Sequence, residues 1–315
     1  MLTVGVDVGG TSVRGGVVDA SGAVLDTARA STPAGQDALE GAIVAVVTEL
    51  SRRHHVHAVG LAVAGFVNTE RTRVMFAPHL AWREQPVAQR ISARLGLPVV
   101  LEHDTNAAVI AEHRYGAARG SQVTVLIALG TGIGAGLLVN GELFRGEHGV
   151  APELGHLRLV PGGRPCSCGR GGCWERYCSG TALATTAVEL LADDPGMSTS
   201  LVREVGEDAH ALTGRRVAAA ARDGDPLAER AMADLARWLG EGLALVADVY
   251  DPGLVVIGGG VSESAPLFLD AAREHYAAAL TGAGHRPLAR IRTAQLGDDA
   301  GVVGAATLAR ACERM

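Results

Sequence analysis

The chain has 315 residues, of which 48% are hydrophobic and 20% charged, and its formal net charge is −6. The length permits two domains with separate cores, and the acidic balance disfavours a nucleic-acid-binding protein, which normally carries a basic surface. All 28 Lys+Arg residues are arginines. A Walker A loop, a protein-kinase lysine and Schiff-base chemistry all need a lysine and are therefore excluded.

The N-terminal part of the chain alternates between strand and helix patterns. Alternating or short continuous apolar runs predict strands, and apolar residues at helical spacing predict helices. The predicted strands are Leu2–Val8, Arg14–Val18, Ala23–Ala30, His57–Val63 and Val99–Glu102, and the predicted helices are Asp37–Arg53 and Gln85–Leu95. This alternation predicts an α/β fold with a mainly parallel sheet flanked by helices.

The pattern then starts again. Val123–Leu129 is followed by the turn Gly130-Thr131-Gly132, by a strand that ends at Val139 and by a tight turn at Asn140-Gly141. The first residues of the chain show the same succession: a strand, a turn of glycine and threonine, a second strand and a tight turn. We interpret this as an internal duplication, with two related halves that face one another across a cleft. The alternative is a coincidental similarity between two hairpins.

Helical patterns dominate after Gly180. The longest is Asp225–Val249, whose Asp-Pro start is typical of a capped helix. Leu254–Ile257 is a predicted buried strand, and a last helix covers Gly301–Cys312. The predicted domains are a small α/β domain, 1–118 with the C-terminal helix of 301–315, and a large α/β domain, 119–300.

One glycine-rich segment of the large domain concentrates one histidine and three cysteines. They are His156, Cys166, Cys168 and Cys173. One imidazole and three thiols are the ligand set of a closed tetrahedral zinc site. Glu153 and Glu175 flank this loop, 156–173, and their carboxylates could bind hydroxyl groups. The alternative is a zinc knuckle with no further role.

The N-terminus and the cysteines also predict a location. Met1–Asp7 has the pattern of a strand and not of a signal peptide, and the apolar runs are too short to cross a bilayer. We therefore expect metal binding in a reducing cytoplasm and no disulfides.

Glycine turns follow buried strands in both halves. Bare backbone N–H groups at such turns allow a phosphate to approach closely. The turn residues are Gly9, Gly10 and Thr11, then Gly130, Thr131 and Gly132, and finally Gly258, Gly259 and Gly260, which could make room for a flat nucleoside. Because lysine is absent, the phosphate charge must be met by the backbone, by Arg14 and by a metal. Asp7 is placed to hold hydrated Mg²⁺.

Asp104 lies where a predicted strand ends and a helix begins at Thr105-Asn106. As an N-cap it would only close the helix end, which is the commonest role of Asp at such a place. As a general base it would accept the proton of an attacking hydroxyl in phosphoryl transfer. The residues by themselves leave both roles open.

Several motifs occur together in this chain. They are Asp7-Val-Gly-Gly-Thr11, Leu129-Gly-Thr-Gly-Ile-Gly-Ala-Gly-Leu137, Glu153-Leu-Gly-His156, the Cys-x-Cys-x4-Cys loop and Gly258-Gly-Gly260. This set resembles the ROK family of repressors, open reading frames and sugar kinases, and most of all its bacterial ATP-dependent glucokinases. The resemblance runs from Val4 to Ala311. It implies the actin/hexokinase-like fold, a duplicated ribonuclease-H-like architecture with two domains around a cleft.

The resemblance also implies roles for individual residues. Asp104, in the segment His103-Asp104-Thr105-Asn106, matches the catalytic base, and the glycine turns match the phosphate and adenosine contacts of ATP with Mg²⁺. The residues that match sugar contacts are Gly65, Glu153, His156 and Glu175. One nitrogen of His156 would bind a structural Zn²⁺ and the other would meet the sugar, so the metal would fix the histidine tautomer.

Two positions depart from the family pattern. His103 stands directly before Asp104 where the family usually has Asn, and His79 stands where glucokinases of the family often have Asn. Neutral His donates and accepts only from opposite edges and is bulkier than Asn. These replacements could therefore change which sugar epimer fits, or they could be tolerated without effect.

We expect an ATP-dependent hexokinase, with glucose as the substrate and Asp104 as the base for its 6-hydroxyl. The alternatives are another hexose, an N-acylhexosamine or, outside enzymes, a sugar-responsive regulator. A regulator normally carries a helix-turn-helix module, and none precedes the turn that begins at Asp7. The family implies a homodimer or higher homo-oligomer, and we expect neither a nucleic-acid nor a membrane partner.

Overall fold

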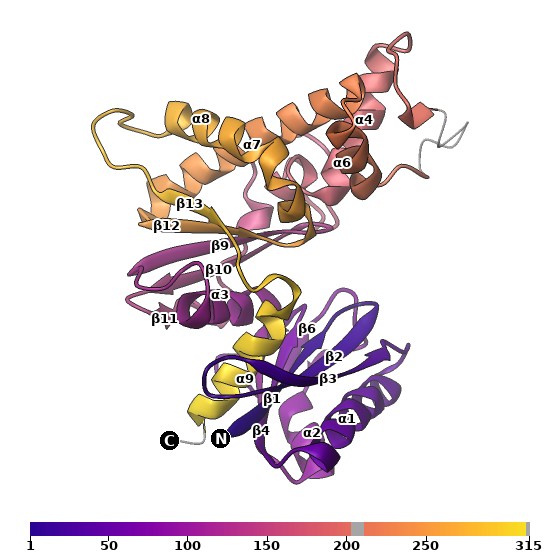
Figure 1. Ribbon diagram of the computed structural model, residues 1–315, viewed down its shortest axis with the longest axis vertical. Coiled ribbons are helices and arrows are strands. Elements are labelled where there is room, and N and C mark those ends of the chain that lie inside the picture. Colours follow the sequence, from indigo (N-terminus) through magenta and orange to yellow (C-terminus); the bar gives the residue numbers. More distant parts are fainter. Residues whose placement is uncertain (203–210, 313–315) are drawn as a thin grey trace. The chain divides into compact units, whose positions relative to one another are not determined.

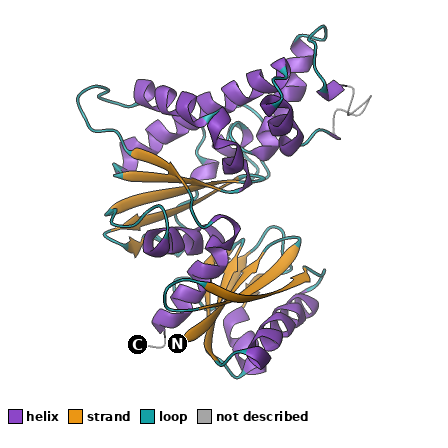
Figure 2. Cartoon of the chain, in the orientation of Figure 1, coloured by secondary structure: helices purple, strands orange, loops and turns teal. Residues whose placement is uncertain are grey.

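The computed structural model describes residues 1–202 and 211–312, with mixed α/β structure throughout (Figures 1 and 2). The chain forms two compact units, which are described separately. The first contains Met1–Leu126, Gly136–Pro152 and Ala294–Met315, and the second contains Ile127–Ala135 and Glu153–Thr293. The division into domains 1–118 and 119–300 stays a prediction, and residues 313–315 of the expected last helix lie outside the described residues.

The first unit is built on a five-stranded sheet of order β3-β2-β1-β4-β8. Its strands are β1 (Leu2–Val8), β2 (Ser12–Val18), β3 (Val24–Ser31), β4 (Val56–Val63) and β8 (Val99–His103). β1 pairs antiparallel with β2 and parallel with β4, and β4 pairs parallel with β8. A small antiparallel sheet adds β5 (Phe66–Val67), β6 (Val74–Phe76) and β7 (Arg83–Gln85).

Helices cover both faces of this five-stranded sheet. They are α1 (Gln36–Arg53) and α2 (Val87–Leu95) on one face, and α3 (Asp104–Tyr115) and α9 (Ala300–Cys312) on the other (Figure 1). A Cβ at Gly15 of β2 would meet Val46 of α1, whereas a Cβ at Gly16 would meet Val302 of α9. Consecutive strand residues face opposite sides, so β2 contributes to the core on both faces.

The contact between α9 and the sheet depends on glycine at Gly60 of β4. A Cβ there would overlap the carbonyl oxygen of Ala305 in α9. We expect Gly60→Ala to lower the free energy of unfolding by about 3 kcal/mol, because the helix must shift. Urea unfolding measures this. Gly41→Ala in α1 is the matched control, since its nearest neighbour would be 3.8 Å away. It should be neutral or stabilising, and equal losses in both variants would contradict this packing.

The second five-stranded sheet has the order β11-β10-β9-β12-β13. Its strands are β9 (Val123–Leu129), β10 (Ile133–Val139), β11 (Glu142–Leu143), β12 (Leu254–Gly258) and β13 (Arg290–Thr293). β10 and β11 pair antiparallel through the expected turn at Asn140 and Gly141, both of which have positive φ, whereas β12 and β13 pair parallel. The first three strands of each half, β1, β2 and β3 and then β9, β10 and β11, lie in the same order within their sheets, and β4 and β12 take the same next place. This equivalence confirms the predicted duplication.

The remaining helices belong to the second unit. They are α4 (Gly180–Asp193), α6 (Gly214–Arg222), α7 (Pro226–Tyr250) and α8 (Leu269–Ala279), with short 3₁₀ segments at Leu154–His156, Trp174–Arg176 and Gly260–Leu267; a further one, Gly297–Asp299, precedes α9 in the first unit. The Asp225 side chain accepts hydrogen bonds from the backbone N–H groups of Leu227 and Ala228, which confirms the predicted capped start of α7. Within the described residues, none of the helices combines the length and apolar character that a membrane span requires.

Candidate active site and metal centre

The candidate residues of the first unit follow the ends of three parallel strands. Val8 pairs with Val63, and Val63 pairs with His103. The strands β1, β4 and β8 therefore end in register. Gly9, Gly65 and Asp104, which come after these ends, lie at one edge of the sheet, where open α/β sheets bind their ligands.

Asp7 precedes the first glycine turn and lies in a strongly charged environment. Its burial and the nearby carboxylates of Asp104 and Asp298, opposed by Arg14, raise the pKa of Asp7 to about 6. A bound cation would relieve this repulsion. Carboxylate oxygens are also the ligands that Mg²⁺ prefers, so this group of residues fits the predicted magnesium ion.

Asp104 is the first residue of α3, and the N-cap position belongs to His103, whose side chain makes no capping bond. Asp104 Oδ1 accepts a hydrogen bond from the backbone N–H of Thr105 at 2.7 Å and lies 3.3 Å from His103 Nε2. The Asp104 side chain is 37% exposed. A carboxylate that is fixed on one side and open on the other suits a general base.

The two histidines that depart from the family pattern lie near this edge. His103 Nδ1 is 2.8 Å from Thr105 Oγ1, so both ring nitrogens of His103 have a polar neighbour within the chain. His79 is exposed, and its Cβ would be 3.4 Å from a Cβ at Gly10. His79 therefore lies beside the first glycine turn, and His103 lies beside Asp104.

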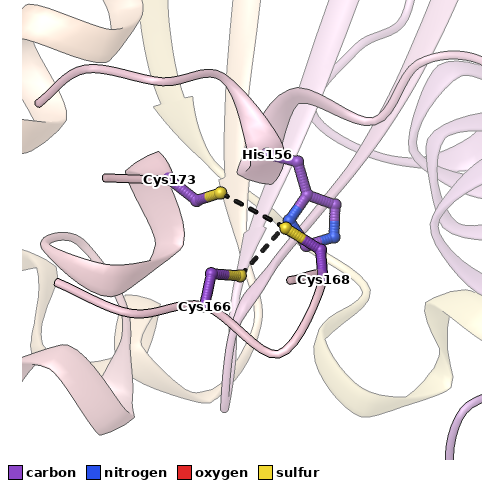
Figure 3. A group of neighbouring side chains, drawn as sticks. All are labelled: His156, Cys166, Cys168 and Cys173. Carbon is purple, nitrogen blue, oxygen red and sulfur yellow. Dashed lines mark hydrogen bonds between the residues drawn. The ribbon is translucent and has the colours of Figure 1, made fainter. Parts of the chain in front are cut away.

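The predicted metal ligands of the second unit come together in space. His156, Cys166, Cys168 and Cys173 place one ligand atom each within 4.8 Å of one another, and their side chains point inward (Figure 3). Cys166 Sγ is 3.7 Å from His156 Nδ1, and Cys168 Sγ is 3.6 Å from Cys173 Sγ. Ligands at about 2.3 Å from a tetrahedral zinc ion lie about 3.7 Å apart, so both the donor set and its spacing fit zinc.

The thiols differ in their readiness to ionise. Burial raises the pKa of Cys166 to about 12. Burial also acts to raise the pKa of Cys168, but hydrogen bonds with the backbone and side chain of Arg170 and with Cys166 and Cys173 together outweigh it and lower this pKa to about 6. A metal needs thiolates, and Cys168 supplies one near neutral pH.

The two flanking glutamates lie beside this cluster. Glu175 Oε1 accepts the thiol hydrogen of Cys166 at 3.0 Å and lies 3.7 Å from His156 Nδ1, whereas His156 Nε2 faces Glu153 Oε2 at 4.0 Å. The ring thus turns Nδ1 toward the thiols and Nε2 toward Glu153. A Cβ at Gly132 would overlap Glu175 Oε2, so Glu175 also lies against the second glycine turn.

Trp174 anchors the metal loop to α7. The ring is fully buried, its Nε1 donates to the carbonyl of Trp238 at 2.8 Å, and a Cβ at Gly242 would overlap the ring. Cys173 and Glu175 adjoin this anchor in sequence. Their positions are therefore fixed by the core of the second unit.

The two glycine turns of the second unit meet at the end of β9. Gly259 has a φ of 77°, and a Cβ there would overlap the backbone of Leu129, directly before Gly130. The Gly130 N–H donates to the Gly132 carbonyl at 2.9 Å, which closes the tight turn. Bare backbone from Gly130–Gly132 and Gly258–Gly260 is thus brought together, as a nucleotide site requires.

Sequence reasoning missed three charged residues near the first-unit site. The carboxylate of Asp298 helps to raise the pKa of Asp7. The carboxylate of Glu102, directly before His103, is buried and accepts a hydrogen bond from Arg145. A carboxylate in an otherwise apolar strand end is a signal that could have identified Glu102, because such a group needs a partner.

Comparisons with known proteins agree with these features. The ROK family model matches residues 3–312. A glucokinase of Streptomyces coelicolor is 43% identical over 309 residues, which cover 98% of each chain. A ROK family glucokinase from Streptomyces griseus, solved in complex with glucose and AMPPNP, is 43% identical, with a TM-score of 0.89 and 99% of this chain and 100% of that chain covered. A ROK hexokinase from Thermus thermophilus is 32% identical, with a TM-score of 0.80 and coverage of 100% and 99%.

Proposed function

The chain belongs to the ROK family, and we infer that it is an ATP-dependent sugar kinase that phosphorylates glucose. The observation that carries this inference is the 43% identity, over nearly the whole chain, to a glucokinase solved with glucose and AMPPNP. The fold is accordingly the two-domain actin/hexokinase-like fold. A coupled assay of ADP formation over a panel of hexoses and N-acetylhexosamines tests the function, and absence of turnover with glucose would overturn it.

We propose Asp104 as the general base. Its carboxylate accepts the proton of the sugar 6-hydroxyl while that oxygen attacks the γ-phosphate in line. The backbone N–H of Thr105 holds one carboxylate oxygen, which leaves the other for the hydroxyl. This contact orients the carboxylate toward the hydroxyl, and misplacement of such a catalytic group by about 1 Å can lower the rate about a hundredfold.

We assign nucleotide contacts to the glycine turns and sugar contacts to residues beside the metal loop and the strand ends. The nucleotide residues are Gly9, Gly10, Thr11, Arg14, Gly130, Thr131, Gly132, Gly258, Gly259 and Gly260, and the sugar residues are Gly65, His79, His103, Glu153, His156 and Glu175. Asp7 would hold hydrated Mg²⁺, which neutralises phosphate charge when bound. Bare backbone in the turns and the carboxylates near His156 support these assignments.

We propose that His156, Cys166, Cys168 and Cys173 hold a structural Zn²⁺. The inward-facing ligand atoms within 4.8 Å support this. A thiolate site of this kind needs a reducing compartment, so we propose a cytoplasmic enzyme, and by family a homodimer or higher homo-oligomer. Light scattering coupled to size-exclusion chromatography tests the oligomeric state.

A kinase for another hexose or an N-acylhexosamine is the second candidate, because His79 and His103 replace amide side chains. Both ring nitrogens of His103 already have partners. His103→Asn would free an amide that can both donate and accept. We expect this variant to raise the ratio of kcat/KM for glucose over mannose by about tenfold.

His55→Asn is the control for that measurement, because His55 is an exposed residue between α1 and β4. Its selectivity should match that of the unmodified enzyme. If the His103→Asn ratio stays within about twofold of the unmodified enzyme, the replacement is tolerated and His103 does not select the epimer.

A further inference from the structure

Glu102 is a buried carboxylate directly before the segment that carries the proposed base. Its side chain is 1% exposed. Oε1 accepts hydrogen bonds from the backbone N–H of His103 at 3.0 Å and from the Asn106 amide at 3.1 Å. One carboxylate oxygen therefore holds the chain on both sides of Asp104.

Two arginines complete the environment of Glu102. Arg145 Nε donates to Oε1 at 3.1 Å, and Arg71 Nε donates to Oε2 at 2.8 Å. Both oxygens are thus engaged, and a single carboxylate pairs with two guanidinium groups, so it offsets one of their two positive charges. Burial, reinforced by Arg71 and opposed by Glu102, lowers the pKa of Arg145.

Arg145 extends the network to the turn between β5 and β6. Its NH1 and NH2 groups donate to three successive backbone carbonyls, those of Val67 (3.2 Å), Asn68 (2.9 Å) and Thr69 (2.9 Å). Val67, the first of these residues, lies two residues after Gly65. The carbonyl of Arg71 also accepts from the backbone N–H of Leu101 in β8 at 3.0 Å. The turn is therefore tied to the same strand end as Asp104.

We propose that Glu102, with Arg145 and Arg71, is a positioning residue for phosphoryl transfer: it fixes Asp104 and the turn after Gly65 relative to one another. This inference rests on the proposed function. Glu102 is buried and acts through the residues it holds. A carboxylate serves here because it has acceptor sites for four donors at once and offsets part of the arginine charge.

Glu102→Gln tests the proposal, since Gln keeps the shape but loses the charge and one acceptor. We expect kcat to fall by about 10- to 100-fold, as expected for a base misplaced by about 1 Å, while the KM for glucose changes by less than about threefold. Circular dichroism and thermal melting report the folded fraction. Unchanged kcat per folded molecule would show that Glu102 has only a structural role and would overturn the proposal.

A second variant keeps the test decisive. Glu102→Gln combined with Arg71→Gln returns this group to the net charge it has in the unmodified protein and lets the two amides hydrogen-bond, so we expect it to recover at least about tenfold of the lost kcat. Failure of this recovery would contradict the charge-balancing role. If Glu102→Gln alone does not fold, Arg71→Gln alone should still lower kcat with little change in KM, and full activity would overturn the proposal.

Glu84→Gln is the matched control, because Glu84 is 69% exposed and lies 3.8 Å from Arg73 in the same unit. Its kinetics should equal those of the unmodified enzyme. The unmodified enzyme also separates the two hypotheses. If it does not phosphorylate any hexose, the proposed function fails; if it does and the Glu102 variants keep full kcat, only the positioning role fails.

Discussion

Asp104→Ala is expected to lower kcat by about 10²- to 10⁴-fold, the usual contribution of a positioned general base. The fall should appear in kcat and kcat/KM together, because the proton transfer is made only in the transition state. Glucose binding, measured by calorimetry, should survive, since the sugar contacts proposed at Glu153, His156 and Glu175 remain.

Asp104→Asn separates base chemistry from orientation. The amide oxygen can still accept from the Thr105 N–H, which is 2.7 Å from Oδ1 in the structure, so the start of α3 should be preserved. We expect the same loss of kcat with a glucose Kd within about threefold of the unmodified enzyme. A kcat within about tenfold of the unmodified value in both variants would contradict the base assignment. Asp37→Asn, at a 92% exposed side chain, is the control.

Features that depend on neighbouring residues could be predicted from the sequence. The four candidate zinc ligands lie within one short segment, so their spacing alone indicated the cluster that the structure shows. The strands β1 and β9 were predicted with their observed bounds, because each is an apolar run that stops at a glycine turn. Asp225 and its proline predicted the start of α7 for the same reason.

Features that depend on distant pairing could not be predicted. Arg145 and Glu102 are 43 residues apart, and nothing local indicates that they meet. The helix expected from Gln85 begins at Val87, because residues 83–85 form the strand β7, which pairs with β6. Both strands have only three residues, which is too short for a periodic pattern to show in the sequence. Likewise, the sequence shows that His103 differs from the residue usual in the family, but its contacts with Asp104 and Thr105 are seen only in the structure.

Cys168→Ser is expected to remove zinc and to weaken glucose binding. Loss of one thiolate breaks the four-ligand set, so the zinc content measured by plasma mass spectrometry should fall from one per chain towards zero. The glucose KM should rise at least about tenfold, with a smaller change in kcat, because ground-state sugar contacts are lost. Ser167→Ala, between the two cysteines and exposed, is the control and should keep both zinc and KM.

The reason for this coupling lies in Glu175 and His156. Cys166 Sγ lies 3.0 Å from Glu175 Oε1, so a proposed metal ligand directly contacts a proposed sugar contact. A metal needs the Cys166 thiolate, which cannot donate to Glu175, and a metal held at Nδ1 of His156 would keep the ring proton on Nε2, toward Glu153. A chelated protein with an unchanged glucose KM would show that the metal only closes the loop. Retention of one zinc per chain in Cys168→Ser would instead refute the ligand assignment.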